Sequence, residues 1–231
     1  MTLVHQRLLE MLTSVATALG DNLREDLVFV GGCTTALFIT DPVVLGEVRY
    51  TDDVDLIVDL TGFGEWVKLK EELRELGFTE NIEDKIICRM RYGAIKVDFM
   101  PDDEEILGFT NRWYAKGINT ALTHELRDDL HIKCLTPPLF LATKLEAYLG
   151  RGNNDPLSSH DLEDILIVVD GREELVDEVQ KADEDVRSFI AQQLQKITQH
   201  PDFDSFLHGN IRGPLGRVDI VSQRLSALKS E

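Results

Sequence analysis

The chain of 231 residues has no long apolar run. A membrane-spanning helix needs about 20 consecutive, mostly apolar residues, and no segment meets that requirement. The N-terminus also lacks the basic, apolar and small-residue order of a secretory signal peptide. We therefore expect a soluble, cytoplasmic protein without a membrane partner. Its 43% of hydrophobic residues can form one large domain or two small ones.

Cysteine is scarce, and its spacing does not suggest cross-linking. The cysteines are odd in number, far apart in the sequence and not spaced with histidines as zinc ligands are. Neither a disulfide framework nor a zinc site is indicated, and buried free thiols are the simplest interpretation. These residues are Cys33, Cys88 and Cys134.

Basic residues are also few. The chain has 24 lysines and arginines against 42 aspartates and glutamates, which gives a net charge of −18. Broad nucleic-acid surfaces are usually basic, because they gain affinity by neutralising phosphates. The charge argues against such a surface but leaves room for a local basic groove. Candidates for that groove are Lys144, Arg151, Arg89, Arg91 and Lys96.

The apolar pattern separates a mixed first half from a mainly helical second half. The first half predicts helices over residues 3–19, 34–39 and 65–76, and strands over 27–30, 51–59, 86–91 and 94–100. The second half predicts helices over 136–149 and 160–170, then further helix with breaks near Pro201 and across 209–216. Residues 102–105 are predicted to form an acidic loop. We expect an α/β (α+β) fold, with a short mixed sheet in residues 1–110 and a mainly helical lobe over 111–231.

Residues 51–59 are the most informative segment, because carboxylates occur there within an apparently buried strand. Strand side chains alternate between faces, so Asp53 and Asp55 share one face while apolar residues share the other. Neighbouring carboxylates repel each other and are costly to desolvate unless a cation neutralises them. Mg²⁺ commonly takes one or two protein carboxylates and completes its shell with phosphate oxygens and water. The pair therefore favours Mg²⁺ and phosphoryl or nucleotidyl chemistry.

A third carboxylate follows the same logic. Asp98 lies in a predicted strand in which Val97 and Phe99 face the opposite way. If this strand neighbours the first, Asp53, Asp55 and Asp98 form a cluster that can hold two metal ions.

A glycine turn supplies a candidate phosphate site. Gly31 and Gly32 follow a short apolar strand and lead into a predicted helix. Backbone N–H groups of such a turn suit anionic phosphates, and Thr34 and Thr35 add hydroxyl donors.

In this order the motifs resemble the DNA polymerase β-like nucleotidyltransferase superfamily. That superfamily has a glycine pair after the first strand, Asp-x-Asp on the next strand and a third Asp on a later one. A narrower resemblance is to abortive-infection toxins of the AbiEii and MenT types. Their motifs are a glycine-serine turn, Asp-x-Asp, an isolated Lys, and a basic residue followed by Asp-x-x-Asp. The matching segments are Arg49-x-Thr51-x-Asp53-Val54-Asp55-Leu56, Lys144 and His160-Asp161-Leu162-Glu163-Asp164-Ile165, and the resemblance covers roughly residues 27–170.

The resemblance implies a nucleotidyltransferase core that binds an NTP with Mg²⁺. It implies that Asp53 and Asp55, with Asp98 as third acid, ligate Mg²⁺. It also implies that Lys144 contacts nucleotide phosphate, that Asp161 orients this lysine or the nucleotide, and that Gly31, Gly32, Thr34, Thr35 and Thr51 line the nucleotide site. Two departures stand out: the turn reads Gly-Gly-Cys, and His160 replaces the usual Lys or Arg.

The expected reaction is transfer of NMP from an NTP to an acceptor hydroxyl. The resemblance favours tRNA or another RNA 3′ end, with toxicity as the outcome and a cognate antitoxin as partner. The acidic composition favours a protein or small-molecule acceptor instead. The alternative from another class is an antitoxin-like or regulatory module that binds a protein partner. An exposed apolar patch at Val218, Ile220, Val221 and Leu225 would favour that alternative.

Simpler structural interpretations stay open for several of these residues. Asp53 and Asp55 fit a solvated edge strand as well, although the apolar run after them argues for burial. A calcium loop is disfavoured because Val58 stands where an EF-hand needs glycine, and no Gly-Lys-Ser/Thr loop accompanies the Asp pair. Lys144 could equally be a lysine on the surface of a helix that pairs with a neighbouring side chain. Asp161 and Asp164 fit helix first-turn carboxylates, and Gly31-Gly32 an ordinary turn.

Overall fold

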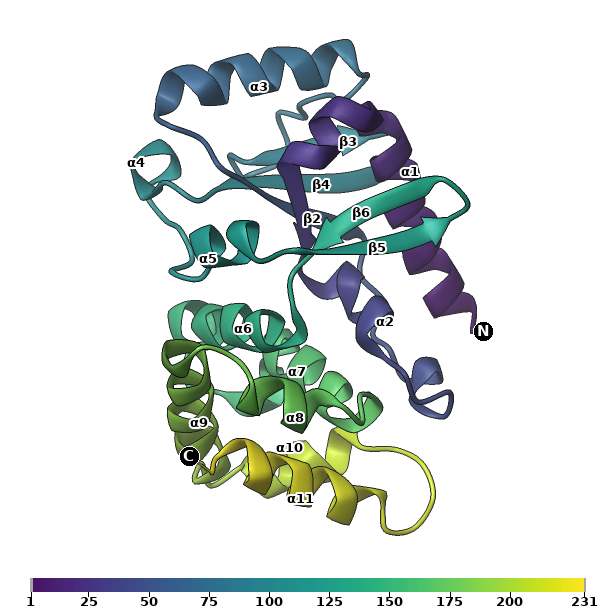
Figure 1. Ribbon diagram of the computed structural model, residues 1–231, viewed down its shortest axis with the longest axis vertical. Helices are drawn as coiled ribbons and strands as arrows, with labels where there is room; N and C mark the ends of the chain where they lie inside the picture. Colours follow the sequence, from purple (N-terminus) through teal and green to yellow (C-terminus); the bar gives the residue numbers. More distant parts are fainter. Residues whose placement is uncertain (1, 231) are drawn as a thin grey trace. The chain divides into compact units, whose positions relative to one another are not determined.

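The computed structural model describes residues 2–230, and these residues form two compact units. The sheet unit comprises Gln6–Thr34 and Tyr50–Thr136. Of the described residues, the helical unit comprises residues 2–5, Thr35–Arg49 and residues 137–230. Figure 1 shows the strands and helices of both units.

A mixed sheet of six strands forms the centre of the sheet unit, in the order β3-β4-β2-β1-β6-β5. The strands are β1 (Leu27–Val30), β2 (Asp53–Val58), β3 (Arg89–Tyr92), β4 (Ile95–Pro101), β5 (Leu122–Arg127) and β6 (Leu130–Cys134). Strand β2 pairs parallel with β4 and antiparallel with β1, and β1 pairs parallel with β6. The hairpins β3–β4 and β5–β6 complete the sheet. The expected mixed α/β class is confirmed.

Burial explains why the central strands form where they do. All residues of β1 are buried, as expected for a short apolar run in the middle of a sheet. In β2 the apolar side chains of Val54 and Leu56 are buried, whereas Asp53 and Asp55 on the other face are only partly buried. The alternation predicted from the sequence is therefore confirmed.

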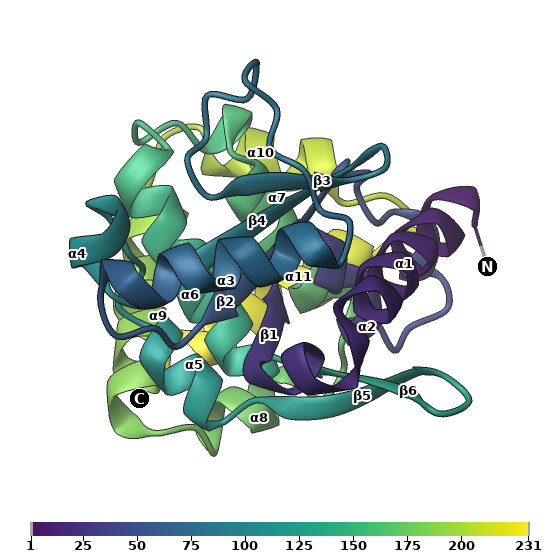
Figure 2. The ribbon, with the colours of Figure 1, turned by 90° about the horizontal axis from the view of Figure 1, so that it is seen from above.

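Helices cover this sheet. They are α1 (Leu3–Asp26), α3 (Phe63–Glu75), α4 (Glu104–Leu107) and α5 (Tyr114–Asn119). In Figure 2, α3 lies across β2 and β4, and it buries Trp66, Leu69 and Leu73. Helix α1 is longer than the predicted 3–19, because a kink at Gly20, with φ of 68°, lets a second helical stretch follow.

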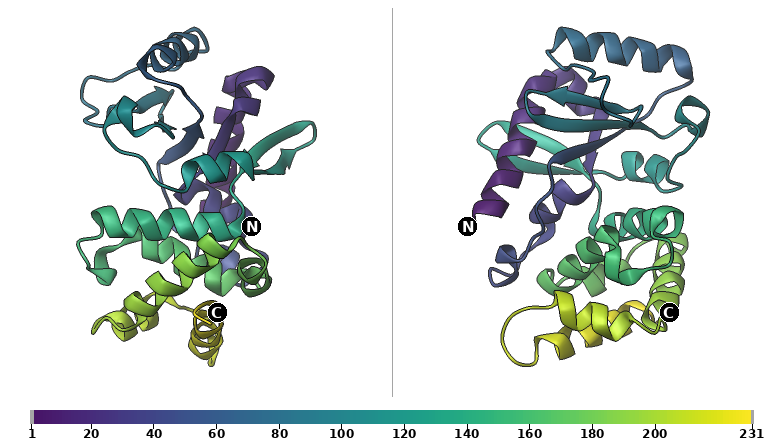
Figure 3. Two further views of the ribbon diagram at one scale, coloured as in Figure 1. Left: turned by 60° about the vertical axis from the view of Figure 1, so that its left-hand side comes forward. Right: turned by 180° about the vertical axis from the view of Figure 1, so that it is seen from behind.

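The helical unit contains α2 (Thr35–Phe38), α6 (Pro137–Arg151), α7 (His160–Gly171), α8 (Leu175–Gln180), α9 (Glu184–Thr198), α10 (Phe203–Asn210) and α11 (Arg217–Leu228). Short 3-10 turns lie at Gly32–Thr34 in the sheet unit, and at Val44–Gly46 and Pro156–Ser158 in the helical unit. Helix α6 packs against α7, α8 and α9, and Figure 3 shows these helices from two further sides. Ser159 caps α7 as expected, because its side chain accepts a hydrogen bond from the backbone N–H of Leu162.

Two segments differ from the sequence prediction. The acidic segment expected as a loop contains α4, because Asp103 caps the helix by accepting from the backbone N–H of Glu105. Strands β5 and β6 occur where mainly helix was expected beyond residue 110. In β6, Leu130, Ile132 and Cys134 are buried in alternation with exposed residues, which is the signature of a strand.

No helix among residues 2–230 combines the length and the apolar character needed to cross a membrane.

Candidate functional site

The sheet brings the three predicted carboxylates together. Strands β2 and β4 are neighbours, and the register places Asp55 directly beside Asp98. Asp53 and Asp55 share one face of β2, and one carboxylate oxygen from each of the three residues lies within 4.8 Å of the others. Asp98 is buried, and the other two are partly buried. The sequence-based condition that the two strands be neighbours is therefore met.

Gly31 allows the turn after β1 to approach this acidic cluster. Its φ of 75° lies in the left-handed region that glycine adopts without penalty. A Cβ atom at this position would lie 1.9 Å from Oδ2 of Asp55. Glycine is therefore required twice over, for the backbone conformation and for the close packing of the turn against the carboxylate.

Arg89, which from the sequence was expected only as part of a basic groove, supplies a positive charge at the acidic cluster. Its Nε and Nη2 donate to the two carboxylate oxygens of Asp98, at 2.7 and 2.8 Å. Nη2 also lies 3.5 Å from Oδ2 of Asp53. The hydrogen bond with Asp98 raises the pKa of the guanidinium further above its usual value. Arg89 thus neutralises part of the charge of the acidic cluster.

Other neighbours shape the same region. The hydroxyl of Thr51 donates to Oδ1 of Asp53, which fixes the orientation of that carboxylate. Burial raises the pKa of the Cys33 thiol, and the charges of Asp55 and Asp53 raise it further. Burial and the charge of Asp98 likewise raise the pKa of Cys88 to about 12. Both cysteines are therefore neutral thiols at physiological pH.

The two threonines expected to donate to phosphate are buried. The hydroxyl of Thr34 donates to the carbonyl of Gly31 at 2.8 Å, so it closes the turn. Thr35 begins α2 in the helical unit, and its Oγ1 is buried without a hydrogen-bond partner among residues 2–230. The Thr34 hydroxyl is therefore already engaged within the turn.

Lys144 and Asp161 meet in a buried ion-pair cluster of the helical unit. Nζ of Lys144, on α6, lies 3.2 Å from Oδ1 of Asp161 and 2.6 Å from Oδ2 of Asp164, both on α7. Lys144 is only 7% exposed, which excludes the surface-lysine interpretation. The structure thus brings two predicted site residues together and adds Asp164 as the nearer partner of the lysine.

Arginines extend this cluster. Arg151 donates two hydrogen bonds to Asp161, at 2.8 and 2.9 Å. Burial acts to raise the pKa of Asp161, but the hydrogen bonds and charges of Arg151 and Lys144 outweigh it, and the pKa is lowered. Arg49 reaches Asp164 at 3.3 Å and Glu163 at 3.7 Å. The charges in the cluster are therefore closely balanced.

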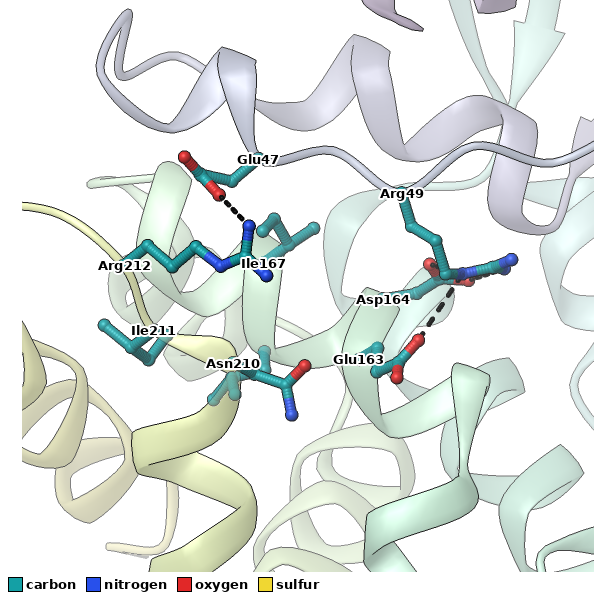
Figure 4. Close-up of a pocket in the computed structure, with 9 residues that line it drawn as sticks. Glu47, Arg49, Glu163, Asp164, Ile167, Asn210, Ile211 and Arg212 are labelled. Atoms are coloured by element: carbon teal, nitrogen blue, oxygen red, sulfur yellow. Dashed lines mark hydrogen bonds and ion pairs between the residues drawn. The ribbon is translucent and has the colours of Figure 1, made fainter.

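A pocket of about 190 Å³ lies beside this cluster within the helical unit. Figure 4 shows Arg49 directed toward Glu163 and Asp164, and Arg212 directed toward Glu47 at 3.8 Å. The remaining lining residues are Leu166, Ile167, Asn210 and Ile211. Its charged groups are paired with one another, and polar and apolar residues line it in similar measure.

The apolar residues suggested as a partner surface on α11 do not form one patch. Val221 and Leu225 are buried, whereas Ile220 is 42% exposed. The spacing of the buried residues is that of a helix packed against its own unit, and α11 indeed contacts α7, α8 and α9.

Comparison of the chain with protein-family models and with curated proteins gives no match. The geometry of the site therefore carries the functional argument. Each unit holds its own charged cluster: the acidic cluster with Arg89 in the sheet unit, and the Lys144 cluster in the helical unit.

Proposed function

We propose that this chain is a Mg²⁺-dependent nucleotidyltransferase that transfers NMP from an NTP to an acceptor hydroxyl. The observation that carries the proposal is the convergence of Asp53, Asp55 and Asp98 on one face of the sheet. Partly buried carboxylates within 4.8 Å of one another are costly unless cations neutralise them. The ordered sequence motifs support the same activity.

The donor set suits a hard divalent cation. Carboxylate oxygens are the ligands that Mg²⁺ prefers, and two or three of them leave room for phosphate and water. Arg89 offsets one of the three carboxylates, which leaves about two negative charges for one divalent ion. We propose Asp53 and Asp55 as the residues that hold it. When bound, Mg²⁺ supplies electrostatic stabilisation of the charge that develops on the reacting phosphate.

The chain's own groups would bind and orient the nucleotide. The turn at Gly31 and Gly32 packs against Asp55, and its backbone N–H groups, apart from that of Thr34, which donates to the Gly31 carbonyl, would bind phosphate oxygens. The Thr51 hydroxyl holds Asp53 in place. In the helical unit, Asp161 and Asp164 both engage the ammonium group of Lys144, so any phosphate contact of this lysine requires one of these two pairs to open.

We propose RNA, such as the 3′ end of tRNA, as the acceptor, with a toxin role for the activity. The net charge of −18 means that RNA would bind at a compact basic groove. The test is incubation with each α-phosphate-labelled NTP, Mg²⁺, total cellular RNA and total protein. Label in RNA, with transfer that falls steeply as salt rises, supports this acceptor. Label only in the protein fraction would overturn the RNA assignment and leave nucleotidyl transfer intact.

A regulatory or antitoxin-like module is the second candidate, and the ion pair between Arg89 and Asp98 favours it. In this pair the arginine neutralises one carboxylate of the cluster without a metal ion. A binding module without catalytic activity would need such neutralisation too. Such a module would bind no divalent ion at Asp53 and Asp55 and would label no acceptor.

A further inference from the structure

Arg89 is fixed at the acidic cluster by two parallel hydrogen bonds to Asp98. A bidentate pair of this kind sets the plane of the guanidinium as well as its position. The Arg89 side chain is only 11% exposed and that of Asp98 only 10%, so the pair forms largely away from water. Both carboxylate oxygens of Asp98 thereby accept hydrogen bonds from Arg89.

The guanidinium keeps donors beyond this pair. An arginine carries five N–H donors, and Nε and Nη2 account for those directed at Asp98 and Asp53. Within the described chain, Nη1 has no hydrogen-bond partner. A largely buried cation with donors left over is suited to an anionic ligand, and phosphate is the anion that arginine binds best.

The same cation disfavours a second metal ion. An ion on Asp98 would stand beside a positive charge that already occupies both oxygens of that carboxylate, and like charges at short range repel strongly. Asp53 shares only one longer contact with Arg89, at 3.5 Å, so the guanidinium offsets the charge of Asp53 and Asp55 less than that of Asp98. This charge arrangement separates the roles of the three acids.

Resting on the proposed nucleotidyltransferase activity, we propose that the acidic cluster takes one divalent ion on Asp53 and Asp55, and that Arg89 binds a phosphate group of the nucleotide. Asp98 is then a positioning residue that holds Arg89 in place. The arginine supplies the second positive charge that a two-ion site would obtain from metal.

The test uses two probes, Mn²⁺ titrated by electron paramagnetic resonance and inorganic pyrophosphate titrated calorimetrically with Mn²⁺ present. Wild type should bind one Mn²⁺ per chain. Arg89→Gln should bind Mn²⁺ about tenfold more tightly, because a neighbouring positive charge is removed and Asp98 is released. It should bind pyrophosphate about tenfold more weakly, because the guanidinium is lost. A general structural defect would weaken both.

Arg91→Gln is the matched control. Arg91 lies two residues along β3 and makes the same bidentate pair with Asp84, at 2.7 Å for both hydrogen bonds. It should leave Mn²⁺ and pyrophosphate affinity within about twofold of wild type, because its partner is not in the acidic cluster.

The double variant Arg89→Gln/Asp98→Asn isolates the role of Asp98. It removes one charge of each sign, so Mn²⁺ affinity should return to within about threefold of wild type while pyrophosphate binding stays weak. Mn²⁺ binding at least about tenfold weaker than wild type would make Asp98 a metal ligand and overturn the proposal. Binding of two Mn²⁺ ions by wild type would also overturn the one-ion proposal, but it would not contradict the proposed nucleotidyltransferase activity. Absence of Mn²⁺ binding in folded wild type would overturn both.

Discussion

Replacing Gly31 by alanine should destabilise the sheet unit and disturb the acidic cluster together. The backbone φ of 75° costs an alanine about 1–2 kcal/mol. The new Cβ would lie 1.9 Å from Oδ2 and 2.9 Å from Cβ of Asp55, and forcing extra atoms into a packed site costs about 1–3 kcal/mol more. Gly31→Ala should therefore lower the free energy of unfolding by about 2–5 kcal/mol and weaken Mn²⁺ binding.

Gly93→Ala provides the matched control in the same unit. Gly93 has φ of 58° in the β3–β4 turn, and a Cβ there would meet nothing within 4 Å, so only the backbone cost of about 1–2 kcal/mol applies. Trp66 and Trp113 are the only tryptophans and both are buried in the sheet unit, so fluorescence during urea unfolding reports on that unit. Equal destabilisation by the two variants, with Mn²⁺ binding unchanged in Gly31→Ala, would refute the packing argument.

Three further predictions concern buried charges and thiols. Lys144→Met should destabilise the helical unit by about 3 kcal/mol in circular dichroism of urea unfolding, because Asp161 and Asp164 lose a buried partner; an unchanged midpoint would contradict this. Because the pKa of Asp161 is lowered, its stabilising effect is present above its ordinary value of 3.8 and lost as the pH falls below it. Asp161→Asn should flatten that acid loss of stability, and an acid profile as steep as wild type would count against it. At mildly alkaline pH, a thiol reagent should react with Cys33, Cys88 and Cys134 only after denaturation, because burial raises the pKa of each thiol. Fast reaction of the native protein would contradict this prediction.

Strand β2 and the shared face of its carboxylates were predictable because period-two alternation is a local property of the sequence. Asp53 and Asp55 had to share a face once β2 was assigned. The position of Asp98 required one further condition, the adjacency of β2 and β4, which the structure supplies. The hairpin β5–β6 carried the same alternation from Leu130 to Cys134, but its strands are short and lie in a region dominated by helical signals.

The partner of Arg89 was harder to predict, because it depends on the register of a hairpin. The two-residue turn at Gly93-Ala94 pairs Tyr92 with Ile95, and this register sets Arg89 opposite Asp98. A turn one residue earlier would move each pairing by two residues and leave Arg89 facing a different side chain. The ion pairs of the Lys144 cluster also could not be predicted from the sequence, because they depend on how α6 packs against α7.

Nucleotidyl transfer by this chain can be measured as Mg²⁺-dependent transfer of label from an α-phosphate-labelled NTP. Asp53→Asn and Asp55→Asn should each lower transfer by about a hundredfold or more, with unfolding midpoints no lower than wild type, because a metal ligand is lost while carboxylate repulsion is relieved. Asp52→Asn is the control, since this adjacent carboxylate is 54% exposed and pairs with Lys96. We expect Mg²⁺-dependent transfer by wild type and Asp52→Asn alone. Full transfer by Asp53→Asn or Asp55→Asn, or transfer that continues after Mg²⁺ is chelated, would contradict it.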